Sequence, residues 1–319
     1  MQFLSTVGSG LWVWLDAITY PRSASNFGAR ALATEKPIVP SSRCMMPVQI
    51  RITADDFGWT RAQNQAVEQA CAAGTLTHAS LLTNGFAVDD AVAVAKRVPQ
   101  LGVGVHLTLC EGAPLSDPAA LAGLTSADGH FHDGLSPLLS LYLRRSLPLS
   151  AIETEWQTQI DRALSLGFSL THIDGHKHVH VLPPLIEIAC RLAQRYRIPF
   201  VRSPYESPSS RIIRRLPGWL VLSSLALSAR QVILRHGLRT ADHFVGFSVS
   251  GGMTEAYLLA AIAAAPSGLT EIMVHPAEES EDLAPLRARY DWAHSYRFGG
   301  ELAALCSPQV RAALLRRAA

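Results

Sequence analysis

Four histidines and one aspartate fall within ten residues of this chain, in the segment THIDGHKHVH at 171–180. All five have even numbers, and side chains of one parity share a face of an extended strand. The segment therefore predicts either a histidine-rich exposed strand end or a strand end that carries metal ligands. We favour the second interpretation. One or two of the histidines would then bind the metal, and the others would orient the imidazole rings of these ligands. The five residues are His172, Asp174, His176, His178 and His180.

Two adjacent carboxylates, Asp55 and Asp56 in the stretch TADDFG, form a second candidate group. They would repel each other if both were buried without partners. A metal resolves this, because one carboxylate can bind it while the other stays close as a base. The alternative is an N-cap for the helix expected near Arg61. His106 in GVHLTL is the third candidate. A lone histidine in a strand is more often structural than a ligand, and a ligand role for His106 is considered only because the two other groups exist.

One carboxylate and two neutral imidazoles make a ligand set for a divalent metal with open coordination positions. A water at such a position becomes a nucleophile near neutral pH, so the natural reaction is hydrolysis of a carbonyl or related centre. Iron oxygenases use the same ligand types, but the spare aspartate and the α/β pattern described next fit hydrolysis better. Mixed oxygen and imidazole ligands suit zinc, manganese, cobalt or, less ideally, magnesium, which leaves the metal open.

Short apolar runs alternate with helical patterns from Pro47 onward, which predicts parallel βα units. The expected strands are 48–56, 78–84, 102–109, 171–178, 200–206, 242–247 and 269–275, and the expected helices are 61–73, 88–98, 149–166 and 183–196. About seven parallel strands favour an irregular (β/α) barrel that is similar to a TIM barrel. Active sites in such folds lie at the carboxyl ends of the strands. The polar residues expected at that edge are Asp55, Asp56, His106, His176, Arg202 and His275.

The first 46 residues look unlike the rest of the chain. Their apolar patch at 11–20 is too short for a membrane span, and no basic residue precedes it as in a secretory signal. We predict a poorly ordered N-terminal extension at 1–46 and one barrel domain at 47–319. Met45 or Met46 would be a natural start just before the first strand.

The overall composition argues against some functions and compartments. A formal net charge of +2 and the lack of a basic stripe argue against nucleic-acid binding. The five cysteines are scattered and form no Cys-x-x-Cys pair. This argues against a disulfide framework and a cysteine zinc knuckle and fits a reducing compartment, so we expect a cytoplasmic protein.

One segment, 211–239, has a composition that the hydrolytic chemistry does not explain. Arginines flank an apolar centre at 218–227, and no acidic residue occurs from 208 to 240. The centre is too short to span a bilayer. It predicts either a buried helix whose arginines reach solvent at its ends or an interfacial apolar and basic helical insertion on the inner face of the membrane. The segment 138–150 has a similar character.

The motifs TADDFG, GVHLTL, HIDGHKHVH and MVHPAE, in this order, resemble those of the YdjC-like (ChbG-type) carbohydrate deacetylase family. The resemblance covers about residues 47–306, and within the family the chain is most similar to the hopanoid biosynthesis-associated branch, HpnK. It implies an irregular (β/α) barrel and the metal-dependent removal of an N-acetyl group from an amino sugar. For that branch the implied substrate is an N-acetylglucosaminyl hopanoid lipid, and the implied cofactor is one divalent ion, Mg²⁺ or Zn²⁺.

The resemblance also implies a role for each candidate residue. Asp56, His106 and His176 match the metal ligands, Asp55 the general base and His275 the general acid. Arg202, in VRSPY, matches the arginine that holds the base in related polysaccharide deacetylases. Supporting roles beside the ligands and the sugar cleft remain for Asp174, His178 and His180. The chain departs from the family pattern in its N-terminal extension and in a C-terminus without a clear last strand, which leaves barrel closure open.

Several functions remain for the structure to separate. The leading hypothesis is the deacetylation of a lipid-linked amino sugar, and a soluble chito-oligosaccharide deacetylase is the first alternative. An amidohydrolase or phosphoesterase is disfavoured, because many of these carry a His-x-His pair on the first strand, where this chain has two aspartates. A non-catalytic lipid- or membrane-surface-binding protein is an alternative of another class. The oligomeric state stays open.

Overall fold

The computed structural model describes residues 47–208 and 216–318. The predicted extension at 1–46, with its start at Met45 or Met46, lies outside the described residues. The same holds for positions 209–215, where the basic and apolar segment begins. Every element below comes from the two described ranges.

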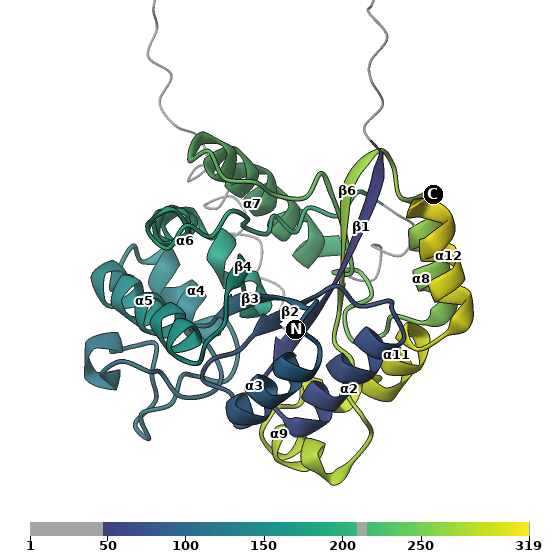
Figure 1. The fold of residues 1–319 in the computed structure, drawn as a ribbon. Helices are drawn as coiled ribbons and strands as arrows, with labels where there is room; N and C mark the ends of the chain where they lie inside the picture. Colours follow the sequence, from purple (N-terminus) through teal and green to yellow (C-terminus); the bar gives the residue numbers. More distant parts are fainter. Residues whose placement is uncertain (1–46, 209–215, 319) are drawn as a thin grey trace, which may run out of the picture. The chain divides into compact units, whose positions relative to one another are not determined.

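A six-stranded parallel sheet forms the centre of the fold, with the strand order β4-β3-β2-β1-β6-β5 (Figure 1). All five neighbouring pairs are parallel, which confirms the TIM-barrel-like irregular (β/α) fold expected from the sequence. The strands are β1 (Val48–Phe57), β2 (His78–Leu81), β3 (Gly102–Leu107), β4 (Leu170–Gly175), β5 (His243–Val245) and β6 (Gly268–Val274).

Helices follow most of the strands and supply the apolar faces that the sheet needs. The α-helices are α2 (Arg61–Ala72), α3 (Val88–Arg97), α4 (Ser136–Leu143), α5 (Leu149–Ser165), α6 (Pro183–Arg195), α7 (Leu216–Arg235), α8 (Glu255–Ala264), α9 (Ala284–Arg289), α10 (Trp292–Ser295), α11 (Phe298–Leu305) and α12 (Pro308–Ala318). Short 3₁₀ helices are η1 (Pro118–Leu121), η2 (His176–Val181) and η4 (Glu281–Leu283). The four helices predicted from the sequence are present within one residue of their expected ends.

The central strand β1 becomes fully buried toward its carboxyl end, from Ile52 to Phe57. It runs between β2 and β6, and helices cover the sheet, so the usual alternation of buried and exposed residues is lost there. The helix α2 then begins at Arg61, and the side chain of the preceding Thr60 accepts a hydrogen bond from the Gln63 N–H in a capping box. Thr60, and not one of the two aspartates, is therefore the N-cap of α2.

The expected seventh strand, 200–206, is present only as isolated bridges to its neighbours. Val201 bridges Ile173 of the edge strand β4, and Glu206 bridges Phe244 of the other edge strand, β5. Pro199 precedes the segment and Pro204 interrupts it, and a proline has no backbone N–H for a ladder. The segment thus contacts both sheet edges without forming a continuous strand.

The histidine-rich segment does not stay extended, as the parity argument required. The strand β4 ends at Gly175, and the chain then turns through Lys177 and His178, with φ angles of 50° and 58°. These left-handed conformations start the 3₁₀ helix η2. The even-numbered residues of 171–180 therefore share one strand face only up to Asp174, and the expectation of one common face for all five was wrong.

Residues 216–235 of the apolar and basic segment form α7, which packs beside α6 (Figure 1). Buried positions such as Leu225, Ala229 and Ile233 face the domain, while Leu220 and Leu227 are about half exposed. Among the described residues, α7 is the one helix long and apolar enough to cross a membrane, and 33% of its most apolar window is buried. Its 20 residues exceed the apolar centre seen in the sequence, so length no longer argues against a span. The packing against α6 is that of a helix lying on a core.

Candidate active site

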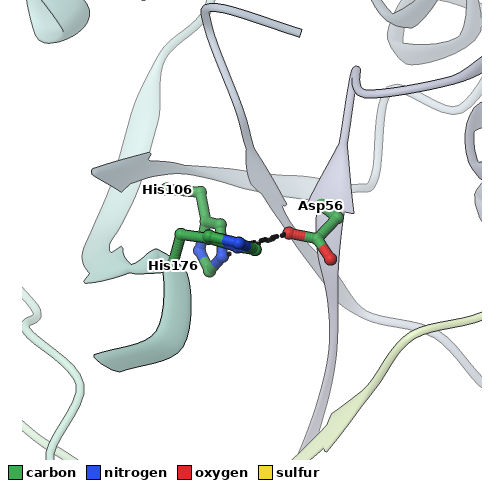
Figure 2. Close-up of side chains that lie close together, drawn as sticks. All are labelled: Asp56, His106 and His176. Carbon is green, nitrogen blue, oxygen red and sulfur yellow. Dashed lines mark hydrogen bonds and ion pairs between the residues drawn. The ribbon is translucent and has the colours of Figure 1, made fainter. Parts of the chain in front are cut away.

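Asp56, His106 and His176 meet at the carboxyl end of the sheet (Figure 2). Asp56 lies at the end of β1, His106 in β3 and His176 directly after β4. The Asp56 Oδ1 atom is 3.0 Å from His176 Nδ1 and 3.4 Å from His106 Nε2. All three side chains are buried. The strand order therefore brings together three residues that lie up to 120 positions apart in the sequence.

These separations fit one divalent cation. Donor atoms that each lie about 2.0–2.2 Å from a shared ion stand about 3–3.4 Å from one another. The donor set is one carboxylate oxygen and two imidazole nitrogens, which suits zinc and several other divalent ions. Three protein ligands would leave room for a water and a substrate oxygen.

Each of the two imidazoles is held by a carboxylate on its far nitrogen. The His106 Nδ1 atom lies 2.7 Å from Asp174 Oδ1, and the His176 Nε2 atom lies 2.9 Å from Glu111 Oε2. Such a carboxylate fixes the ring orientation and makes the metal-facing nitrogen a better ligand. With their far nitrogens protonated, His106 presents Nε2 and His176 presents Nδ1 to the point beside Asp56.

Arg202 lies next to this cluster and joins three buried carboxylates. Its Nη1 and Nη2 atoms donate to the two oxygens of Asp55 at 2.7 and 2.8 Å. Its Nη2 also lies 2.8 Å from Asp174 Oδ2, and its Nε donates to Glu271 Oε1 at 3.1 Å. Arg202 is fully buried, and the carboxylates around it raise its pKa well above the ordinary value despite the opposing effect of burial. Asp55 is thus held in one orientation beside the metal ligands.

A second group of donors, Asp55, His106 and Asp174, also lies close enough together to hold a cation. Arg202 already donates to both of these aspartates. A metal there would stand beside a guanidinium and compete with it for the same oxygens. The first group contains no ligand that pairs with an arginine, so it is the better metal site.

The charges around the first group favour a cation at its centre. Burial would lower the pKa of His106, but Asp174 and Asp55 outweigh it and raise this pKa to about 10. Burial is likewise outweighed at His176, where Asp56 and Glu111 raise the pKa. The pKa of Asp56 is far below its ordinary value, because the two imidazoles overcome the effect of burial. A metal ion that binds here would displace protons from the imidazoles.

His275 follows β6 and lines the same cavity as the metal candidates and Asp55, a cavity of about 250 Å³. Its backbone N–H donates to Glu301 of α11, which also accepts from the Met253 N–H at 2.9 Å. Its ring lies against Tyr296, with 5.2 Å between the ring centroids. The Nδ1 atom is buried and has no hydrogen-bond partner among the described residues. The ring therefore lies at the wall of the cavity, and no described side chain occupies its Nδ1 atom.

The other histidines of the 171–180 segment lie outside the three-residue cluster. His178 lines the cavity and packs edge-on against Phe244, with 5.9 Å between the ring centroids. His180 Nε2 donates to the Arg202 carbonyl at 2.9 Å and so supports the backbone of that arginine. His172 Nε2 contacts Ser80 Oγ at 3.1 Å.

A glycine in β3 makes room for His172. A Cβ atom on Gly104 would lie 2.4 Å from the His172 ring, far inside van der Waals contact. Because Ser80 Oγ also donates to Asp174 at 2.6 Å, this packing layer positions the aspartate that orients His106. The glycine in GVGVH thus connects the local sequence to the ligand geometry.

Glu111, which no sequence motif marked, is buried and contacts three residues of the site. Besides His176 it accepts hydrogen bonds from Lys177 Nζ and, at 3.0 Å, from Trp292 Nε1. A signal was present, since Glu111 follows a predicted strand at the same edge as the other candidates. Trp292 and Tyr296 also line the cavity. They come from the C-terminal part of the chain, where no strand or motif pointed to the site.

Comparisons with known proteins agree on one family. Residues 49–316 match the family described as YdjC-like protein. A carbohydrate deacetylase of Mus musculus is 34% identical over 244 residues, which cover 72% of this chain and 78% of that protein. A carbohydrate deacetylase of Brevibacillus brevis is 38% identical over 158 residues, and this shorter match covers 50% of this chain and 60% of the relative.

A solved structure supports the fold independently. A proposed cellobiose-phosphate cleavage protein of Enterococcus faecalis superimposes with a TM-score of 0.65 at 24% identity. The match covers 85% of this chain and 95% of the other. At this identity the likeness concerns the fold alone.

Proposed function

The chain belongs to the YdjC-like protein family, and from this premise we propose that it is a metal-dependent carbohydrate deacetylase. The reaction is the hydrolysis of an N-acetyl group on an amino sugar, which gives acetate and a free amine. One observation carries the proposal: the cluster of Asp56, His106 and His176 lies in the same cavity as Asp55, which Arg202 holds by two hydrogen bonds.

The metal is expected to be held by Asp56, His106 and His176. A divalent cation supplies Lewis-acid chemistry, which polarises the amide carbonyl and lowers the pKa of the attacking water. Charge balance supports this ligand set, because the surrounding carboxylates raise the pKa values of both imidazoles and so favour positive charge at this point.

Asp55 is the proposed general base. Both of its oxygens accept from Arg202, yet each carboxylate oxygen has a second lone pair with which to accept a proton from water. Its neighbour Asp56 faces the imidazoles instead, so the two adjacent carboxylates have different partners. A base at this position would contribute about 10²–10⁴-fold to the rate.

His275 is the proposed general acid. It lines the cavity from β6, whereas Asp55 reaches the cavity from the neighbouring strand β1. Protonation of the amide nitrogen by His275 would let the amine leave as the C–N bond breaks. The water thus supplies the oxygen of acetate, and the amine nitrogen gains one proton.

For the finer substrate we propose an N-acetylglucosaminyl lipid of the hopanoid type. The support is the similarity of the motifs to that branch of the family and the half-exposed apolar face of α7. A soluble chito-oligosaccharide is the second candidate, favoured by the carbohydrate deacetylases among the relatives.

Acetate release from purified protein tests the proposal. The protein is treated with a chelator, reloaded with zinc, magnesium, manganese or cobalt, and incubated with N-acetylated chito-oligosaccharides and with N-acetylglucosaminyl lipids. Acetate should appear only with a metal present and should be lost in His176→Ala. A protein that binds metal and lipid but releases no acetate from either substrate class would be a binding protein and not an enzyme.

A further inference from the structure

A cavity of about 520 Å³ lies at the amino ends of the strands, at the opposite end of the sheet from the candidate active site. Arg51 near the start of β1, His78 at the start of β2 and Leu269 near the start of β6 line it. Among the described residues, this amino-end cavity and the active-site cavity have no lining residue in common. The amino-end cavity is therefore a separate space, and the deacetylase chemistry does not use it.

The lining of the amino-end cavity carries more positive than negative charge. Arg51, Arg230 and Arg239 line it, and Asp242 is the one acidic residue of its described lining. His78 is neutral at pH 7, because burial and the nearby Arg51 lower its pKa to about 4. Three arginines against one aspartate leave two net positive charges around the cavity.

Asp242 has partners that do not include all of these arginines. Its Oδ2 atom accepts from the Leu269 N–H at 2.9 Å, and its Oδ1 atom lies 3.4 Å from Arg230 Nη2. Arg230 also donates to the Ala241 carbonyl. Within the described ranges, neither of the two other arginines of the cavity forms an ion pair, so their charges remain unbalanced.

Two buried donor atoms in the wall, Arg51 Nη1 and Thr240 Oγ1, have no hydrogen-bond partner among the described residues. Arg51 is held by Phe200, whose ring centroid lies 4.1 Å from the guanidinium carbon. Phe200 in turn forms an isolated parallel bridge with Arg239, which brings the second arginine to the same wall. Buried polar atoms are nearly always paired with protein, water or a ligand, so this wall requires an acceptor.

Glu271 does not supply that acceptor for the whole wall. It is the register partner of Arg51 across β1 and β6, its Oε1 atom accepts from Arg202 at 3.1 Å, and its Oε2 atom has no described partner. An internal water between Glu271 Oε2 and Arg51 Nη1 would satisfy these two atoms. It would leave Thr240 Oγ1 without an acceptor and the charge of Arg239 without a counterion. An anion inside the cavity would provide both.

We propose that the amino-end cavity binds a small phosphomonoester, whose phosphate group accepts hydrogen bonds from Arg51, Arg239 and Thr240. A phosphomonoester carries about −1.5 to −2 charges at neutral pH, which balances the two positive charges of the lining. Its three terminal oxygens are strong acceptors, and arginine binds phosphate through paired hydrogen bonds. The volume lies within the range of about 300–1,000 Å³ that is typical of ligand pockets, so an organic group fits beside the phosphate. This site is independent of the proposed deacetylase function, and either proposal can fail without the other.

Calorimetric titration of the zinc-loaded, full-length protein with glycerol 3-phosphate and with inorganic phosphate tests the proposal. The titrations contain about 0.15 M sodium chloride, which screens unspecific attraction between charges. We expect saturable binding of one molecule of either probe for each protein chain. Absence of saturable binding would overturn the proposal. Binding to phosphatidylglycerol vesicles without binding of either soluble phosphate would assign the arginines to a membrane surface and would also overturn it.

Variants of the wall locate the bound phosphate. Thr240→Val keeps the shape of the side chain and removes a hydroxyl that has no described partner, so the melting temperature should stay unchanged. Its affinity for glycerol 3-phosphate should fall about tenfold, and that of Arg51→Met and Arg239→Met about 10–100-fold. Arg235→Met is the matched control, because it removes an equal charge from α7 at an exposed side chain outside the cavity. Equal affinity in all four variants would overturn the proposal.

Phosphate bound to the metal would give a different pattern. His176→Ala removes a candidate metal ligand and should leave the affinity for glycerol 3-phosphate unchanged. Loss of binding in His176→Ala, with full binding in Arg51→Met, would place the phosphate at the active site and overturn the proposal. Acetate release from the same preparations is the readout of the deacetylase proposal alone, and Thr240→Val should retain it.

Discussion

Glu111 and His176 are joined by a hydrogen bond of 2.9 Å between Oε2 and Nε2, which leaves the Nδ1 atom of the imidazole facing Asp56. His106 has the same arrangement with Asp174, on its opposite nitrogen. Both candidate metal ligands are therefore oriented by buried carboxylates. Loss of such a partner typically lowers metal affinity about 10–100-fold.

Glu111→Ala should lower the affinity for zinc by about 10–100-fold, because the His176 ring would lose its fixed orientation. Glu111→Gln should lose less, since its amide oxygen can still accept from Nε2. Calorimetric titration of the chelator-treated protein measures both. The control is Glu187→Ala, which removes a surface glutamate that also contacts a histidine, His236, at 2.8 Å. Equal metal affinity in the two alanine variants would remove the positioning role.

Asp55→Asn and Asp56→Asn should separate the two adjacent carboxylates by function. Asp55→Asn should keep its metal and lose about 10²–10⁴-fold in kcat, because an amide cannot accept the proton of water. Asp56→Asn should lose metal affinity first. Metal content and acetate release are measured on the same preparations. Loss of metal in Asp55→Asn, with Asp56→Asn still loaded, would reverse the assignment.

Arg202→Met should lower the free energy of unfolding by about 3–5 kcal/mol, because it leaves buried carboxylates without their charge partner. The control is Arg97→Met, which removes an exposed arginine that makes two hydrogen bonds of 2.6 Å to Glu68. Solvent screens that surface pair, so its loss should lower the free energy of unfolding far less. Urea unfolding of the metal-free proteins measures both. Similar losses would mean that the buried network is not held by this arginine.

Gly104→Ala should destabilise the fold by about 1–3 kcal/mol, because the added methyl group would overlap the His172 ring. Displacement of that ring would also disturb Ser80 and the aspartate that orients His106. Gly252→Ala is the matched control, since its Cβ would meet only ordinary contacts, the nearest at 3.5 Å. Gly104→Ala should lower both the melting temperature and the affinity for zinc. Gly252→Ala should leave both unchanged.

The metal-free protein should lose stability as the pH falls from about 6.5 toward 4. Burial lowers the pKa of His180 to about 4 and that of His172 well below its ordinary value. The unfolded chain takes up protons on these imidazoles below about pH 6.5, and the folded chain does not. His180 alone would lower the free energy of unfolding by up to about 3 kcal/mol as the pH falls across this window. Urea unfolding at pH 7 and pH 5 with a chelator present measures it; equal stability would show that these rings are protonated in the fold.

The sequence predicted the position of the site residues better than the backbone conformation around them. Asp55, Asp56, His106 and His275 stood at ends of strands that periodicity predicts well, so a parallel sheet had to bring them to one edge. The sequence predicted a strand that continues into 176–178, and this was wrong. The order of apolar and polar residues does not indicate the left-handed conformations of Lys177 and His178 that end the strand. Such turns usually carry glycine, and here they do not.

Contacts between distant segments were beyond the reach of sequence patterns. The hydrogen bond between Glu111 and His176 depends on the loop after β3, and Trp292 reaches the cavity from a four-residue helix. Arg202 was expected at the edge from a strand over 200–206, which forms only isolated bridges, and its role beside Asp55 came from motif similarity. An apolar cavity of about 440 Å³ between α4, η2 and α7 depends on how these helices pack, which no local pattern specifies.

The segment with Arg202 joins the two sheet edges through isolated bridges, and its strongest ties to the sheet are charges. Arg202 holds carboxylates of β1, β4 and β6 at once. The contact between this segment and the sheet and the electrostatic balance of the active site therefore share these ion pairs. Loss of these carboxylates would abolish catalysis and would also destabilise the barrel. Selection for folding alone would therefore preserve the catalytic charges.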